Sequence, residues 1–99
     1  MGHHITQEEI NAINNQRAYL LDVRSAEEVA VSACPGAIHW DVRQMAAGRF
    51  PNIPRNMPVF VFCRSGNRSS TAQRLLGGAG FTDAHDVGGL ENVPVEFLK

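Results

Sequence analysis

One cysteine-centred segment carries the residues best suited to chemistry in this chain of 99 residues. Cys63 directly follows an apolar run at 59–62, and the residues after it are Arg64, Ser65, Gly66, Asn67, Arg68 and Ser69. A buried strand would bring the thiol to the start of this loop, and a helix is expected to follow from about residue 70. A helix N-terminus has unpaired N–H groups and partial positive charge, which favour a thiolate and an anionic ligand. The segment therefore predicts a reactive cysteine beside an anion-binding loop.

The same segment predicts that Cys63 is ionised at neutral pH. A free cysteine has a pKa near ~8.5, whereas a helix N-terminus and neighbouring arginines can lower the pKa of a thiol to ~3.5–7.5. Arg64 and Arg68 lie within five positions of Cys63 and supply such positive charge. We predict that Cys63 is a nucleophile, that Arg68 closes the loop and orients an anion, and that Arg64 acts mainly as a local positive charge. A buried structural cysteine is the alternative, and it leaves the glycine and both arginines unexplained.

Length and composition limit the classes of protein to consider. The chain is long enough for one domain over residues 1–99, of which residues 1–4 are expected to be disordered or derived from a tag. The formal net charge of −1, with no stripe of basic and aromatic residues, argues against nucleic-acid binding. No apolar stretch is long enough to span a membrane, and residues 1–16 lack a secretory signal pattern. We therefore expect a cytoplasmic protein that binds neither membranes nor nucleic acid.

The second cysteine and the histidines are assigned no catalytic role. Cys34 precedes a Pro-Gly turn, and it is interpreted as a small apolar residue that fills space before this turn. A redox pair with Cys63 is the alternative, and it would require their Cα atoms to lie within roughly 7 Å. The histidines are dispersed, without the spacing typical of metal ligands, so that we expect neither a metal nor another cofactor.

Strand and helix signals alternate along the chain. Capping-box pairs, Thr6 with Glu9 and Ser25 with Glu28, predict two short helices. Strands are predicted at 19–23, 37–40, 59–62 and 84–87, and further helices at 44–47 and from 70 to a glycine between 77 and 80. This alternation predicts an α/β fold, a small and mainly parallel sheet with helices on both faces. Cys63 would then lie at the carboxyl end of a strand, where such sheets bind ligands.

Four segments, in the right order and over nearly the whole chain, resemble the rhodanese family of single-domain sulfurtransferases. They are residues 20–24 followed by Glu28, residues 35–38, residues 59–69, and residues 80–81 continuing through 87–90. The resemblance implies a rhodanese-like fold and thiosulfate sulfurtransferase activity, in which Cys63 carries the sulfur as a persulfide. It also implies that residues 64–69 bind a small anionic sulfur donor, thiosulfate or a persulfide. The acceptor would be cyanide or a thiol, including one carried by a protein.

Two residues of the first matching segment are assigned to structure. Asp22 and Arg24 stand at a predicted strand end, where a carboxylate and a guanidinium commonly pair and brace a neighbouring loop. We predict this supporting role for both residues and no part in the reaction.

Other functions stay open at this point. A cysteine-dependent phosphatase or arsenate reductase also closes a cysteine loop on an arginine, but the tyrosine-phosphatase pattern has one residue more than the four between Cys63 and Arg68. The chain also has no clear aspartate to act as general acid. A rhodanese-like regulatory or interaction module would not need Cys63, Gly66 and Arg68 together. A redox switch formed by Cys34 and Cys63 is the third alternative.

Overall fold

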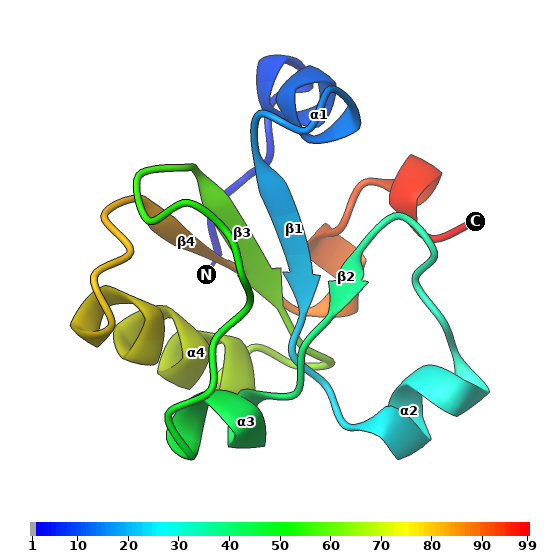
Figure 1. Cartoon of the computed structure of the whole chain (residues 1–99). Coiled ribbons are helices and arrows are strands. Elements are labelled where there is room, and N and C mark those ends of the chain that lie inside the picture. Colours follow the sequence, from blue (N-terminus) through cyan, green and yellow to red (C-terminus); the bar gives the residue numbers. More distant parts are fainter. Residues whose placement is uncertain (1) are drawn as a thin grey trace.

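Four short strands form one parallel sheet in the computed structural model, which describes residues 2–99. They are β1 (Tyr19–Asp22), β2 (Ile38–His39), β3 (Val59–Phe62) and β4 (Ala84–Gly88). Their order across the sheet is β2-β1-β3-β4, and every neighbouring pair is parallel (Figure 1). The parallel α/β sheet predicted from the sequence is therefore confirmed.

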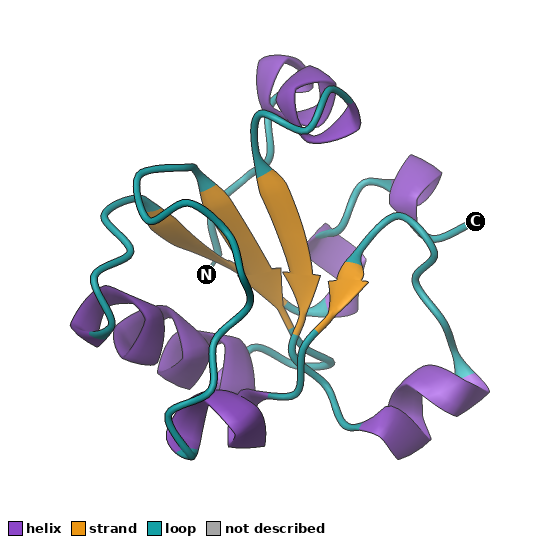
Figure 2. Cartoon of the chain, in the orientation of Figure 1, coloured by secondary structure: helices purple, strands orange, loops and turns teal. Residues whose placement is uncertain are grey.

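Helices connect the strands and cover both faces of the sheet (Figure 2). They are α1 (Gln7–Asn14), α2 (Ala26–Val31), α3 (Val42–Ala46), α4 (Asn67–Gly78) and two 3₁₀ turns, η1 (Leu90–Asn92) and η2 (Val95–Phe97). Both predicted capping boxes are present, at Thr6 before α1 and at Ser25 before α2. None of the helices among residues 2–99 is long and apolar enough to cross a membrane.

Successive side chains of a strand point to opposite sides of the sheet. The central strands are buried on both sides because both faces of the sheet are covered. On one face, Val61 and Cys63 of the β3 segment pack with Leu76 of α4 in the first core cluster. On the other face, Phe60 and Phe62 belong to a second cluster. The two cores hold β3 rigidly and fix where the chain leaves it at Cys63.

Element ends differ most from the sequence expectation at β2 and at the starts of α3 and α4. β2 has only two residues instead of four, α3 begins at Val42 and α4 begins at Asn67. Asp41 starts α3 early because its carboxylate accepts from the backbone N–H of Arg43. Gly66 starts α4 early because its φ of +108° turns the chain directly from the loop into the helix.

The N-terminal segment lies against β4. The backbone N–H of His3 donates to the carbonyl of Asp86 at 2.6 Å, and the His3 ring stacks on Phe60 and contacts His85. Of the residues expected to be disordered or tag-derived, Met1 lies outside the described residues. Gly2 to His4 have a defined position, and their derivation from a tag stays a prediction.

Candidate active site

Cys63 is the first residue after β3, at the carboxyl edge of the sheet. Its backbone N–H donates to the carbonyl of Gly88 at 3.0 Å. A bulge in the pairing of β3 with β4 brings Gly88 opposite Phe62. A second contact holds the loop, because the N–H of Leu90 donates to the carbonyl of Arg64 at 3.3 Å. The backbone on both sides of the thiol is therefore tied to the end of β4.

Backbone and hydroxyl groups surround the sulfur of Cys63. The N–H of Gly66 donates to Sγ at 2.9 Å, and the hydroxyl of Ser69 lies 3.6 Å from the same atom. The Ser69 hydroxyl is buried, and it is within hydrogen-bond distance of the Gly66 carbonyl (3.0 Å). A hydroxyl has one proton and can rotate, so that Ser69 can accept from a thiol or donate to a thiolate.

Burial and hydrogen bonding act on the pKa of Cys63 in opposite directions. Burial raises the pKa because an apolar interior disfavours the thiolate. The Ser69 hydroxyl and the N–H groups of Ser69, Gly66 and Ser65 outweigh burial, so that the net pKa of Cys63 lies below that of a free thiol. The direction agrees with the sequence prediction. Hydrogen bonds are the main cause of the lowered pKa of Cys63, and the charge of Arg68, which interacts with Cys63, acts in the same direction.

Arg68 is held by a carboxylate from another helix. Its Nη1 donates to Oε1 of Glu28 at 2.5 Å, and its Nη2 donates to Oε2 at 2.9 Å. The guanidinium lowers the pKa of Glu28 to about 2, so that the pair stays ionised at neutral pH. Sequence analysis used Glu28 only as a capping and family-pattern residue, and it did not predict this contact. Forty residues separate the two partners, so that no local spacing rule could identify the pair.

The remaining loop residues face two different pockets. Arg64 is exposed and lines one pocket together with Val31 and Leu90. Ser65, Gly66 and Asn67 line a second, polar pocket. Ser65 also forms a β-bridge with Gly89, and both residues line the second pocket. The loop therefore meets solvent on two sides, although Cys63 itself is fully buried.

Asp22 and Arg24 form a buried ion pair at the carboxyl end of β1. Each side chain is 2% exposed, and two hydrogen bonds of 2.9 and 2.7 Å join the guanidinium to the carboxylate. Arg24 also donates to the carbonyl of Ser32 at 2.7 Å. The pair thus connects the end of β1 to the residue that follows α2, and neither side chain is hydrogen-bonded to Cys63.

Cys34 packs away from the loop. It belongs to the core cluster on the opposite face from Cys63, and its thiol donates to the carbonyl of Phe97 at 3.1 Å. Burial raises the pKa of the Cys34 thiol. Both cysteines are free. This placement fits the interpretation of Cys34 as a small core residue.

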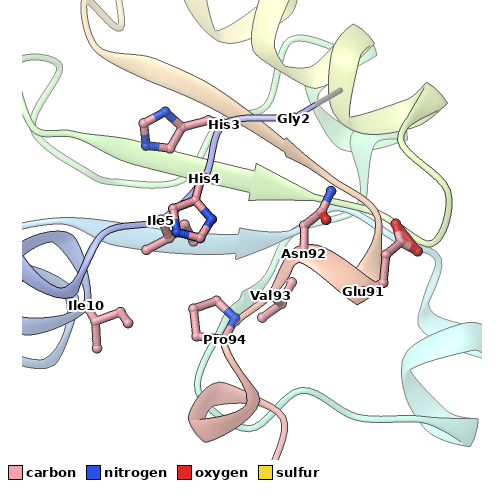
Figure 3. A pocket seen from close by; sticks show the side chains of 9 residues that line it. All are labelled: Gly2, His3, His4, Ile5, Ile10, Glu91, Asn92, Val93 and Pro94. Atoms are coloured by element: carbon pink, nitrogen blue, oxygen red, sulfur yellow. The ribbon is translucent and has the colours of Figure 1, made fainter.

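Outside the Cys63 loop, the structure has a further pocket but no cluster of metal-ligating side chains among residues 2–99. Among residues 2–99, no group of three or more histidine, cysteine, aspartate or glutamate side chains is arranged to hold a metal ion. A third pocket lies between the N-terminal segment and residues 91–94. Figure 3 shows its lining side chains, and residues 63–69 are not among them. The chemistry predicted from the sequence therefore concentrates at the Cys63 loop.

Similarity to known proteins extends over most of the chain. A family model described as Rhodanese-like domain matches residues 6–93. The tRNA sulfurtransferase of Desulfurococcus amylolyticus is 40% identical over 83 residues, covering 84% of this chain but only 16% of that longer relative. The thiosulfate sulfurtransferase GlpE of Pseudomonas savastanoi pv. phaseolicola is 33% identical over 85 residues, covering 86% of this chain and 79% of the relative. The structure of the human single-domain sulfurtransferase TSTD1 has a TM-score of 0.69 at 27% identity, covering 83% of this chain and 84% of that one.

Proposed function

Because the chain belongs to the family of rhodanese-like domains, we propose that it is a sulfurtransferase with Cys63 as its sulfur carrier. The observation that carries the proposal is the contact of the Gly66 N–H with Sγ of Cys63 at 2.9 Å. This contact puts a hydrogen-bond donor where negative charge resides before and after sulfur transfer. Named sulfurtransferases among the relatives, GlpE included, support the same reaction class.

The first step moves a sulfur atom onto the enzyme. The Cys63 thiolate attacks the outer sulfur of thiosulfate, forming a new S–S bond to Sγ. The S–S bond within thiosulfate breaks, and its electron pair leaves with sulfite. The products are a Cys63 persulfide anion and sulfite, so that charge and atoms balance without a metal or another cofactor.

The second step returns the enzyme to its starting state. Cyanide, or the thiolate of a small molecule or protein, attacks the outer sulfur of the persulfide. The S–S bond to Sγ breaks, its electron pair returns to the Cys63 thiolate, and thiocyanate or a new persulfide leaves. Both steps use the same hydrogen bonds, because the sulfur atoms carry negative charge in each.

In this proposal, the loop of residues 64–69 binds the sulfur donor. The N–H groups from Arg64 to Ser69 form an anion-binding turn at the start of α4. Arg68 contributes a guanidinium that Glu28 holds in place. The exposed Arg64 contributes positive charge at the solvent side of the Cys63 loop. Since Cys63 is fully buried, side chains around the Cys63 loop must move before a sulfur donor reaches Sγ. A small anion meets that requirement more easily than a bulky one.

Steady-state kinetics test the proposal. Thiocyanate formation is measured while thiosulfate and cyanide are varied, and a covalent intermediate predicts parallel double-reciprocal lines. Cys63→Ser should abolish turnover, whereas Cys34→Ser should retain it. Intersecting lines would contradict the two-step route. Absence of transfer from thiosulfate and from persulfides in the wild type would favour the interaction module instead.

A further inference from the structure

We propose that Glu28 is a positioning residue for sulfur transfer, which holds the Arg68 guanidinium beside the Cys63 loop in the orientation that receives the anionic sulfur donor. This inference rests on the proposed function. Glu28 makes no hydrogen bond to Cys63, and it would act on the reaction through Arg68.

The geometry of the pair supports a positioning role. Two hydrogen bonds join the planar groups end to end, at 2.5 and 2.9 Å, and such a fork fixes both the place and the plane of a guanidinium. The side chains are 38% and 26% exposed, for Arg68 and Glu28 respectively. The ion pair between Glu28 of α2 and Arg68 of α4 is therefore partly shielded from solvent.

Glu28 is itself held in place. One of its carboxylate oxygens accepts from the backbone N–H of Ser25 at 3.2 Å and from the Ser25 hydroxyl at 3.0 Å. These contacts belong to the capping box that starts α2. The start of one helix is thus connected through Ser25 and Glu28 to the arginine in the first turn of α4. A carboxylate fixed in this way can restrict Arg68 more than a mobile surface glutamate could.

The pair leaves Arg68 able to bind an anion. A guanidinium has five N–H donors, and the two bonds to Glu28 use two of them. Within residues 2–99, the side chain of Arg68 makes no other hydrogen bond. Three N–H donors therefore remain for a thiosulfate or sulfite oxygen while Glu28 keeps its hold.

Positioning and charge have opposite effects on donor affinity, which makes the role testable. A carboxylate beside an anion site repels the anion, so that its removal should strengthen binding if only charge matters. The other charged groups that act on Arg68 are Asp41, Arg43 and the Cys63 thiolate. They stay in place when Glu28 alone is changed. If Glu28 positions Arg68, its removal should weaken binding despite the more positive site.

The test compares Glu28→Gln with the wild type and with Glu27→Gln. We expect Glu28→Gln to raise KM for thiosulfate about tenfold, the effect of losing one well-placed charged hydrogen bond, and to leave KM for cyanide less affected. Glu27→Gln removes the same charge from the same helix, but Glu27 has no hydrogen bond to Arg68. This control should leave KM for thiosulfate unchanged or lower it. Glu28→Asp keeps the charge but shortens the side chain, and it should raise KM as well.

A double-mutant cycle decides whether Glu28 acts through Arg68. In an Arg68→Ala background, Glu28→Gln should have no further effect on KM, because the group that it positions is gone. The inference is overturned if wild type is active while Glu28→Gln and Glu28→Asp leave KM unchanged or lower it. It is also overturned if Glu28→Gln raises KM equally with and without Arg68, since the effect would then come from α2. An inactive wild type with all sulfur donors would instead remove the proposed function.

Discussion

At Cys63, burial is the largest single influence on the pKa, and it disfavours the thiolate. Several smaller influences, mainly hydrogen bonds, together favour the thiolate. Burial alone would leave an inert thiol at the end of β3. Gly66, Ser69 and Ser65 reverse that outcome because their N–H and O–H groups converge on one atom. Reactivity at this residue therefore depends on the shape of the loop more than on the nearby arginines.

This balance predicts the pH dependence of alkylation. The rate for Cys63 should rise with pH and reach half its maximum below ~8.5, the pKa of an unperturbed cysteine, because its hydrogen bonds favour the thiolate. Cys34 should react more slowly at every pH, since burial raises its pKa. Glu28 does not contribute to this rise, because its carboxyl has a pKa of about 2 and stays ionised. Mass spectrometry of peptides alkylated at a series of pH values measures both rates, and a Cys63 midpoint at or above the reference value would contradict the account.

The two arginines of the loop should differ in their effect on turnover. Arg68→Ala should lower kcat/KM for thiosulfate by roughly 10–100-fold, as expected for loss of hydrogen bonds to a charged ligand. Arg64→Ala should lower it only a few-fold, because Arg64 is exposed and supplies mainly charge. Initial rates with thiosulfate as the varied substrate measure both effects.

Arg68→Lys separates charge from geometry. A lysine keeps the charge, but it cannot form the two parallel bonds to Glu28. We expect only partial recovery of activity relative to Arg68→Ala. Full activity in Arg68→Lys, or equally small losses in both alanine variants, would contradict the assignment of Arg68.

At the scale of the elements, the start of α4 depends on one glycine. Gly66 has a φ of +108°, and a Cβ there would meet no atom closer than 3.7 Å. Gly66→Ala is thus penalised by backbone strain rather than by a clash, at about 1–2 kcal/mol of unfolding free energy. Relief of that strain would turn the Gly66 N–H away from Sγ. We expect a higher pKa for Cys63 and slower turnover, as measured by alkylation and initial rates.

Gly77→Ala is the matched control for that change. Gly77 lies within α4, and nothing lies within 4 Å of a Cβ built there. The substitution should raise the unfolding free energy by roughly 0.5–1 kcal/mol, without changing the pKa of Cys63. If both variants altered alkylation equally, helix stability rather than the Gly66 contact would control the thiol.

The elements that the sequence predicted best are those with local signals. Thr6 with Glu9 and Ser25 with Glu28 identified two helix starts, because both partners of a capping box lie within one turn. The apolar run before Cys63 identified β3 for the same reason. The early start of α4 was missed because the φ of Gly66 depends on its tertiary surroundings. The contact of Glu28 with Arg68 was missed because only the folded chain brings α2 to α4.

Across the whole molecule, the rhodanese-like α/β fold is confirmed, and a buried ion pair supports the edge that carries the site. Asp22→Asn would leave the Arg24 guanidinium, which is 2% exposed, without its counter-charge. We expect a loss of about 3–5 kcal/mol in unfolding free energy, typical of breaking one partner of a buried pair. Urea unfolding followed by circular dichroism measures it.

Asp41→Asn provides the comparison for Asp22→Asn. Asp41 pairs with Arg43, whose side chain is 73% exposed, and exposed pairs contribute about 0–1 kcal/mol. Asparagine also retains the capping function of Asp41 at the start of α3. Equal losses in the two variants would show that Asp22 and Arg24 do not support the fold in the way described.

The two thiols lie on opposite sides of the sheet in the whole molecule. An internal redox switch would need them to approach each other through the central strands. We therefore favour sulfur transfer by Cys63 alone over a switch that uses both cysteines.

Intact-mass measurement after brief exposure to thiosulfate tests the central claim most directly. The account predicts that the wild-type chain gains the mass of one sulfur atom, that Cys63→Ser gains none, and that cyanide removes the added sulfur. Cys34→Ser should behave like the wild type. If the wild-type chain gains no sulfur from thiosulfate or from any persulfide, while Cys63 is shown to be free and reactive, the claim that Cys63 carries sulfur is contradicted.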